Sequence, residues 1–308
     1  MKVLVTGKGG QLAWELDQTK PEGVELVSLG LDDLDITQQA AVQSAVNLHR
    51  PDIVINAAAY TAVDKAETDH TTAYAVNELG ARYVAQACKQ QGAYLMHVST
   101  DFVFSGDKTI PYQVDEPTKP INVYGASKLA GDIAVNDELA EQALIVRTAW
   151  VYSVNGNNFV KTMLRLMADK PELGIIYDQV STPTWAKGLA LWLWAMAAKQ
   201  NSNSMIKDPN WRGRTPIYHW TDAGVASWYD FAVAIQELAI EKGLLDKVIP
   251  IKAIEASAYP LPAARPSFSV IDKQSAERAS GLNSIHWRQQ LSTMMDQLAE
   301  LKALSTKH

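Results

Sequence analysis

Tyr124 and Lys128 stand four residues apart in a stretch with a helical pattern, so their side chains project from one face of a helix. A free phenol has a pKa of about 10. A neighbouring ammonium group stabilises the phenolate, so we expect Lys128 to lower the pKa of Tyr124. The pair could then donate a proton near neutral pH. The spacing alone is common, and an exposed helix pair without chemistry would explain it equally well.

A hydroxyl group in a second segment favours the chemical interpretation. Ser99-Thr100-Asp101 directly follows the apolar run 94–98, which has the composition of a buried strand. In open α/β sheets, ligands bind at the carboxyl ends of strands. Thr100 and Tyr124 could therefore both donate hydrogen bonds to a carbonyl oxygen, which gains negative charge as a hydride arrives. We predict Tyr124, Lys128 and Thr100 as catalytic residues.

A glycine-rich turn could bind the hydride-carrying cofactor. Residues 7–13, Gly-Lys-Gly-Gly-Gln-Leu-Ala, follow an apolar strand and open a helix. Gly7 permits the tight turn, and Gly10 lets a pyrophosphate approach the free N–H groups at the helix N-terminus. Although any strand-to-helix turn can use glycine, this position in a β–α–β pattern predicts that NADPH or NADH binds here.

The residue that would choose between the two cofactors is not evident. Gly30 stands at the end of the second strand, where a carboxylate often binds the adenine ribose. No arginine follows that could bind a 2′-phosphate, and Asp32 and Asp33 could be loop residues without a ligand. After the third strand, the small residues Ala57 and Ala58 would let the cofactor lie across the strand ends.

Short apolar runs alternate with helical segments through the first half of the chain. Runs rich in Val, Ile and Leu that do not alternate with polar residues are typical of strands buried on both faces. Strands are expected at 3–5, 24–29, 53–55, 94–98 and 144–146, and helices at 38–49, 63–90 and 124–139. This order predicts an α/β fold with a doubly wound parallel sheet of the Rossmann type.

Strand patterns become weak after about residue 150, where glycine, proline and tryptophan are denser. Helices are expected at 184–199, 227–242 and 287–302, with a polar loop at 201–216. We expect a dinucleotide-binding domain at 1–150 and a smaller mixed α/β domain at 151–308 that mainly binds substrate, with part of 151–220 returning to the Rossmann core. Their junction is the expected substrate cleft.

Composition disfavours several other classes of protein. The net charge is −6, and no run of Lys and Arg indicates a face for nucleic acid or a membrane surface. The N-terminus lacks the apolar run of a signal peptide, and the apolar stretch 188–198 is shorter than the roughly 20 residues of a membrane span. Cys88 is a single cysteine, and the six histidines lack the spacing of metal ligands. These features predict a cytoplasmic enzyme without a metal.

The sequence resembles the extended short-chain dehydrogenase/reductase family over nearly its whole length. The segments at 10–12 and 122–131 are general to that superfamily, whereas parts of those at 56–67, 147–152 and 258–266 are far more specific. The motifs that carry the resemblance are Gly-Gln-Leu at 10–12, Asn-Ala-Ala-Ala-Tyr-Thr-Ala-Val-Asp-Lys-Ala-Glu at 56–67, Ser-Thr-Asp-Phe-Val-Phe at 99–104, Asn-Val-Tyr-Gly-Ala-Ser-Lys-Leu-Ala-Gly at 122–131, Arg-Thr-Ala-Trp-Val-Tyr at 147–152, Asn-Asn-Phe-Val-Lys-Thr-Met at 157–163 and Ala-Tyr-Pro-Leu-Pro-Ala-Ala-Arg-Pro at 258–266.

The resemblance implies reduction of the 4-keto group of dTDP-4-dehydro-β-L-rhamnose to dTDP-β-L-rhamnose, with Tyr124 as proton donor and Lys128 as its partner, for cell-surface polysaccharide synthesis. It also implies roles in binding. The implied cofactor contacts are Gly10, Gln11 and Leu12 at the phosphates, Asp35 and Ile36 at the adenosine, and Ala59, Tyr60 and Thr61 on the nicotinamide side, and the implied sugar contacts are Thr100, Asp101 and Trp150.

Two candidate substrate residues have physical alternatives. The indole face of Trp150 suits the apolar face of a deoxysugar, but a core tryptophan at the domain junction would look the same. The guanidinium of Arg265 could bind a diphosphate through two parallel hydrogen bonds, but a surface ion pair would also explain it.

Some members of the family form a dimer around a magnesium ion held by acidic side chains. Glu15 matches one such ligand, but Lys187 stands where a second acid would be, so a metal is doubtful and both monomer and homodimer stay open. Two functional alternatives also stay open: a 4-keto reductase that makes a different 6-deoxysugar, and a non-catalytic subunit that binds NADP. The joint presence of Thr100, Tyr124 and Lys128 argues against the second.

Overall fold

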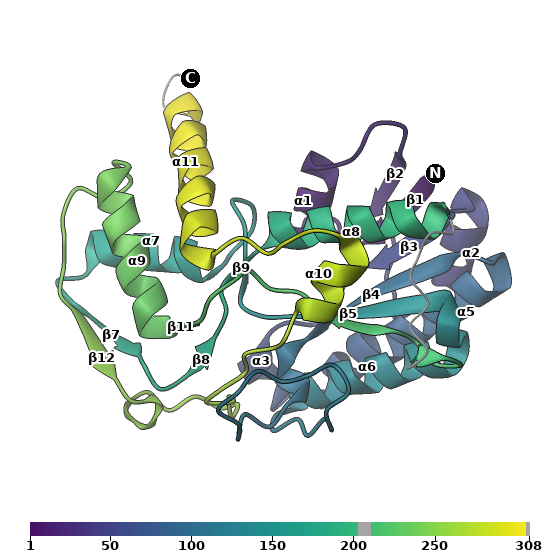
Figure 1. Cartoon of the computed structure of the whole chain (residues 1–308), viewed down its shortest axis with the longest axis horizontal. Coiled ribbons are helices and arrows are strands. Elements are labelled where there is room, and N and C mark those ends of the chain that lie inside the picture. Colours follow the sequence, from purple (N-terminus) through teal and green to yellow (C-terminus); the bar gives the residue numbers. More distant parts are fainter. Residues whose placement is uncertain (203–210, 306–308) are drawn as a thin grey trace.

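The computed structural model describes residues 1–202 and 211–305 (Figure 1). Its largest sheet has six strands in the order β10-β5-β4-β3-β1-β2, and every neighbouring pair is parallel. The strands are β1 (Lys2–Thr6), β2 (Glu25–Leu29), β3 (Ile53–Asn56), β4 (Tyr94–Thr100), β5 (Ala143–Thr148) and β10 (Ile217–His219). The predicted doubly wound α/β class is confirmed.

Successive residues of each strand enter two different cores. On β1, Val3 and Val5 pack in one apolar cluster, while Leu4 packs in the other. The first cluster lies under α1 (Gln11–Gln18), α8 (Ala186–Asn201) and α10 (Gln274–Ser280), and the second under α2 (Gln39–His49), α5 (Ala81–Gln91) and α6 (Val123–Leu139). Because helices cover both faces, the strands need no polar side, which explains their unbroken apolar runs.

The continuous helix expected at 63–90 is wrong. The chain forms α3 (Val63–Ala66) and α4 (His70–Tyr74), then a π-helical turn η1 (Ala75–Gly80) that leads into α5. Asp69 begins α4, because its side chain accepts a hydrogen bond from the Thr72 N–H. Apolar periodicity does not register such a turn or a change of helical pitch, and π-helical turns are frequent at functional sites.

A second group of elements lies beside the sheet and has its own apolar core (Figure 1). Small two-stranded sheets pair β6 with β9, β7 with β12 and β8 with β11. The elements are β6 (Val151–Tyr152), α7 (Phe159–Asp169), β7 (Leu173–Ile176), β8 (Val180–Ser181), β9 (Thr184–Trp185), β11 (Ala226–Ser227), α9 (Trp228–Glu241), β12 (Ile251–Ile254) and α11 (Trp287–Ser305), with a 3-10 turn at η5 (Ala256–Ala258). Two other 3-10 turns belong to the large sheet: η2 (Asp101–Val103) follows β4, and η3 (Ala140–Gln142) precedes β5.

Three helices expected in this half are confirmed to within a few residues as α8, α9 and α11. The expected loop at 201–216 falls partly outside the described residues, which omit 203–210. Within the described ranges, no helix combines the length and the apolar character needed to span a membrane.

Candidate active site

The glycine turn between β1 and α1 lies against the segment that follows β3. Gly7 has a φ of +83°, and a Cβ there would come within 2.9 Å of the Ala58 nitrogen. The Gly10 N–H donates to the Gly7 carbonyl (3.0 Å), and Gly10 is the N-cap of α1. Glycine at position 7 is therefore required by both the backbone conformation and the close approach. A cradle of this kind leaves backbone N–H groups at a helix N-terminus for a phosphate.

Gln11 is held by the second half of the chain. Its side chain accepts a hydrogen bond from Asn158 Nδ2 (3.0 Å) and donates to the Val151 carbonyl (3.4 Å). Leu12, the next residue, is 8% exposed and belongs to the core between the sheet and α8. The turn is thus fixed from both halves of the molecule.

Asp35 and Ile36 lie between β2 and α2. Asp35 accepts hydrogen bonds from the Thr37 N–H (2.9 Å) and hydroxyl (2.7 Å), and the hydroxyl bond is the main reason that the pKa of this carboxyl is lowered. Ile36 is buried and packs against Gly80, where a Cβ would come within 2.7 Å of its Cδ1 atom. Their predicted contact with the adenosine stays a prediction.

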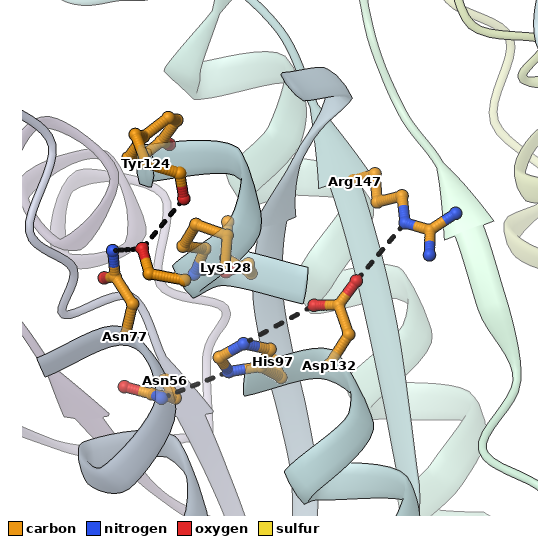
Figure 2. Close-up of polar contacts among 9 residues, drawn as sticks. Asn56, Asn77, His97, Tyr124, Lys128, Asp132 and Arg147 are labelled. Carbon is orange, nitrogen blue, oxygen red and sulfur yellow. Dashed lines mark hydrogen bonds and ion pairs between the residues drawn. The ribbon is translucent and has the colours of Figure 1, made fainter. Parts of the chain in front are cut away.

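Asn77, on the π-helical turn η1, holds the predicted cofactor segment 57–61 in place. Its Oδ1 accepts from the Tyr60 N–H (2.9 Å), and its Nδ2 donates to the Tyr60 carbonyl (3.1 Å) and to Ser127 Oγ (2.9 Å). The Ser127 hydroxyl donates to the Tyr124 carbonyl (2.8 Å), which joins this segment to α6 (Figure 2). Asn77 was not among the predicted site residues, because the sequence around it has the pattern of an ordinary helix.

The start of α6 brings Tyr124 beside Thr100. Asn122 is the N-cap and accepts a hydrogen bond from the Gly125 N–H (2.7 Å). A Cβ at Gly125 would overlap the Phe102 carbonyl oxygen, so only glycine lets α6 approach the turn η2 this closely. The rings of Phe102 and Tyr124 meet edge to face at 5.8 Å. This packing places two segments that are distant in sequence at one strand end.

Thr100 and Asp101 are buried at the end of β4. The Thr100 hydroxyl accepts from the Phe102 N–H (3.2 Å) and donates to Asp101 Oδ1 (3.1 Å). Burial raises the pKa of Asp101 to about 6, although neighbouring hydroxyl groups oppose the shift. Asp101 therefore titrates just below neutral pH, next to the predicted proton donor.

The expectation that Lys128 lowers the pKa of Tyr124 is wrong for this arrangement. Burial raises the pKa of Tyr124 to about 12, despite a hydrogen bond with Thr100, and the negative charges of Asp101 and Asp132 act in the same direction as burial. Lys128 is 2% exposed and its Nζ donates to the Val98 carbonyl (2.6 Å). Burial lowers the pKa of Lys128 to about 8. The phenol is therefore neutral at physiological pH, which is the form that can donate a proton.

Trp150, a further candidate sugar-binding residue, packs against the core of the second group of elements. Trp150 follows β5 with a φ of +44°, a conformation that is strained for a residue with a Cβ. Its ring stacks on that of Trp228 at a centroid distance of 3.4 Å, and the ring of Phe159 packs on Trp228 at 4.6 Å. The stack fixes the plane of the Trp150 indole.

Arg265 forms a bidentate ion pair with Asp64. The two nitrogen–oxygen distances are 2.9 and 2.7 Å, and Arg265 Nη1 also donates to the Ala263 carbonyl (3.0 Å). The guanidinium is the first cause of the lowered pKa of Asp64. This is the ion pair that the alternative interpretation of Arg265 foresaw, and its predicted contact with a diphosphate stays a prediction.

A cavity of about 220 Å³ lies between α6 and the sheet edge, lined by residues that include Asp132, Arg147 and Trp211. None of the predicted site residues lines it. We therefore do not assign the sugar to this cavity.

Comparison with known proteins identifies the relatives of this chain. The family model described as "RmlD substrate binding domain" matches residues 1–300. The chain belongs to this family. Because the match spans the glycine turn, the Tyr124 helix and the Trp150 stack, all three regions lie within one family domain.

Three members of the RmlD family illustrate the similarity. A protein of Burkholderia thailandensis named dTDP-4-dehydrorhamnose reductase is 39% identical over 94% of this chain and 96% of its own length. The crystal structure of a dTDP-4-dehydrorhamnose reductase from Clostridium acetobutylicum is 37% identical, with a TM-score of 0.86 over 97% of this chain and 99% of that chain. That of the Bacillus anthracis reductase in complex with NADP is 34% identical, with a TM-score of 0.84 over 96% and 99%.

Glu15, the metal ligand considered for this RmlD-family chain, has protein partners. Its Oε1 accepts hydrogen bonds from the Ser153 hydroxyl (2.7 Å) and the Trp185 indole N–H (3.0 Å). It is 1% exposed, and burial raises its pKa. Glu15 thus joins α1 to the elements around β6 and β9, and no group of three or more metal-ligating side chains is found among the described residues.

Proposed function

We propose that this protein reduces the 4-keto group of dTDP-4-dehydro-β-L-rhamnose with NADPH or NADH and forms dTDP-β-L-rhamnose. The observation that carries the proposal is the contact between the ends of two elements: Tyr124, on the first turn of α6, lies beside Thr100 at the end of β4, with Lys128 one turn further on. Membership of the RmlD family and the names of the close relatives support the same substrate.

In the proposed reaction, a bound nicotinamide supplies the hydride. Tyr124 donates its hydroxyl proton to the carbonyl oxygen as negative charge develops there, and Thr100 offers a second hydroxyl. A pKa of about 12 keeps Tyr124 protonated before the reaction. The Lys128 ammonium, fixed on the Val98 carbonyl, would stabilise the phenolate that remains after the transfer.

The residues present suit a dinucleotide. The closeness of Gly7 to Ala58 leaves no room for a side chain at the turn, so a pyrophosphate could lie against the backbone. We propose that the cofactor is held by Gly7, Gly10, Gln11 and Leu12 at the phosphates, by Asp35 and Ile36 at the adenosine, and by Ala59, Tyr60 and Thr61 on the nicotinamide side. Further proposed cofactor contacts are Ala57, Ala58, Tyr124 and Lys128.

We further propose that residues 1–150 form the dinucleotide-binding domain and that 151–308 mainly bind the sugar nucleotide. Thr100, Asp101 and Trp150 would contact the sugar, and Arg265 the diphosphate. The stacked indole of Trp150 supports this, because a fixed aromatic face suits an apolar sugar face. The protein would act in the cytoplasm as a monomer or homodimer, without nucleic acid, in supplying a cell-surface polysaccharide.

The decisive experiment gives the purified protein the 4-keto dTDP-sugar with NADPH or NADH and identifies the product by NMR. We expect cofactor oxidation and a product with the L-rhamno configuration. A different 6-deoxysugar as product would assign the chain to a sister 4-keto reductase. Cofactor binding without turnover of either cofactor would identify a non-catalytic subunit and overturn the proposal.

A further inference from the structure

A directed chain of buried hydrogen bonds runs beneath the candidate site. The Ala58 N–H donates to Thr6 Oγ1 (3.3 Å), and the Thr6 hydroxyl donates to Asn56 Oδ1 (2.6 Å). Asn56 must then present its amide N–H to His97 Nδ1, at 3.1 Å. Because Nδ1 accepts, the proton of the neutral imidazole is on Nε2, which faces Asp132 Oδ1 at 3.8 Å (Figure 2). Burial keeps His97 neutral by lowering its pKa.

Asp132 lies beside the end of this hydrogen-bond chain and forms an ion pair with Arg147 of β5. Its Oδ2 lies 3.3 Å from Arg147 Nε, and the side chains of Arg147 and Asp132 are 3% and 4% exposed. A guanidinium keeps its charge in proteins, and an unpaired buried charge costs several kcal/mol. Asp132 is therefore the carboxylate that balances Arg147, although burial raises its pKa.

Asp132 is also one helical turn from Lys128 on α6, so the two side chains project from the same face (Figure 2). Burial lowers the pKa of Lys128, and Asp132 is the charged group that opposes the shift. The same negative charge raises the pKa of Tyr124. One carboxylate thus favours the protonated form of both residues.

The other ionisable groups around α6 have different partners. From β4 and η2, His97 is neutral and Asp101 bonds to Thr100; from β10, His219 is neutral because burial lowers its pKa to about 3. On the face covered by α3, α4, η1 and α5, the acids pair elsewhere: Asp64 with Arg265, Glu67 with the Val123 N–H, Asp69 with Lys65, Glu78 with Arg82, and Glu138 with Arg82 and Lys89.

We propose that Asp132, held by Arg147 and lying next to the neutral His97, is a positioning residue whose charge keeps the buried Lys128 protonated beside Tyr124. The catalytic meaning of this inference rests on the proposed reductase function. In that reaction, a charged Lys128 is the group that stabilises the Tyr124 phenolate. The hydrogen-bond chain that begins at Ala58 ends at His97, so the counter-charge of Asp132 lies next to a residue that is joined to the proposed cofactor segment.

The test measures the pKa of Lys128 directly, by NMR titration of the full chain labelled at the lysine ε-carbons, with the signal assigned by its loss in Lys128→Arg. Asp132→Asn should lower this pKa by about one unit or more, the usual effect of removing an opposite charge nearby. Asp132→Glu keeps the carboxylate and should leave the Lys128 pKa close to the wild-type value. Asp137→Asn makes the same change as Asp132→Asn at an exposed position of α6 and should leave the Lys128 pKa unchanged.

A retained pKa in Asp132→Glu would separate an electrostatic role from a structural one, because a disturbed fold would shift the Lys128 pKa in both variants. If Asp132→Asn alone does not fold, the double variant Asp132→Asn/Arg147→Gln, which leaves no unpaired charge at the pair, is compared with the wild type. The Lys128 pKa should again be lower. No shift without the carboxylate, or an equal shift in Asp132→Glu, would overturn the proposal.

Enzyme kinetics supply a second readout. The alkaline limb of the pH profile of kcat/KM should move to lower pH in Asp132→Asn, by the shift that the NMR titration gives. A wild-type protein without turnover would contradict the proposed function but would leave the NMR result intact, so the two failures are distinguishable.

Discussion

The residues around Tyr124 and those around Trp150 are held in place by different means. At Tyr124 the contributing segments are short and the groups are buried: Lys128 bonds to a strand carbonyl, and Asn77 bonds to both the N–H and the carbonyl of Tyr60 in the cofactor segment. Near Trp150, an indole stack joins residues far apart in sequence. At Arg265 the contact is an ion pair whose two side chains are 18% and 37% exposed.

This difference indicates which geometry is fixed and which can exchange. Buried hydrogen bonds to the backbone are costly to break, because each freed group stays without a partner. A partly exposed ion pair is worth about 1 kcal/mol or less, since water replaces either partner. The proton-transfer geometry is therefore set by folding alone, whereas the guanidinium of Arg265 can leave Asp64 for a ligand anion at little cost.

The largest effect is expected around Tyr124, where the geometry is fixed by folding. Tyr124→Phe removes the proton donor while keeping the ring that packs on Phe102, so kcat should fall by roughly 10²- to 10⁴-fold. The measurement is NADPH oxidation in the presence of the 4-keto dTDP-sugar. Tyr177→Phe, at an exposed tyrosine, is the matched control and should retain the wild-type rate. A near-normal rate for Tyr124→Phe would remove this residue from the mechanism and break the comparison.

The sequence predicted the fixed site around Tyr124 better than the exchangeable contact of Arg265, and for a physical reason. The strand runs and the Tyr124–Lys128 spacing are local patterns, and the parallel sheet brings their ends together. The direction of the Tyr124 pKa was predicted wrongly, because burial outweighs the charge of Lys128, whose Nζ bonds to the Val98 carbonyl. Neither the break in the helix at 63–90 nor the short strand β10 has a periodic signal.

Long-range partners were equally invisible in the sequence. The stacking of Trp228 on Trp150 and the pairing of Asp64 with Arg265 depend on how the two halves fold back on each other. Asn77 lies in a stretch that has the pattern of an ordinary helix, so nothing marked it as the clamp on the segment 57–61.

An intermediate effect is expected at Asp101, which belongs to the fixed site around Tyr124 but can gain and lose a proton. Its folded-state pKa of about 6 exceeds the roughly 3.9 of an unfolded aspartate, so the folded state holds this proton more tightly. The resulting stabilisation is complete below pH ~4 and is lost as the pH rises through about 6. The free energy of unfolding of Asp101→Asn, relative to wild type, should therefore rise by about 2–3 kcal/mol between pH 4 and pH 8.

Urea unfolding at several pH values measures this difference. The cost of packing the amide that Asp101→Asn introduces does not depend on pH. The titration of Asp101 is therefore measured by how the difference in unfolding free energy between variant and wild type changes with pH. Val103→Ala, a change at a buried neighbour without an ionisable group, should give an offset from wild type that stays constant with pH. A constant offset for Asp101→Asn as well would mean that Asp101 does not titrate in this range.

The smallest effect is expected at the exchangeable ion pair of Arg265 and Asp64, and it tests the comparison most sharply. Arg265→Ala should raise KM for the dTDP-sugar about ten-fold with kcat nearly unchanged, the scale of one charge-assisted hydrogen bond lost equally from bound substrate and transition state. Asp64→Asn removes the competing anion, so it should cost about 1 kcal/mol or less in stability and should not raise KM. Steady-state kinetics of the two variants distinguish the roles. If both raise KM alike, the ion pair acts only by holding the loop at 263–265, and Arg265 does not exchange Asp64 for the diphosphate.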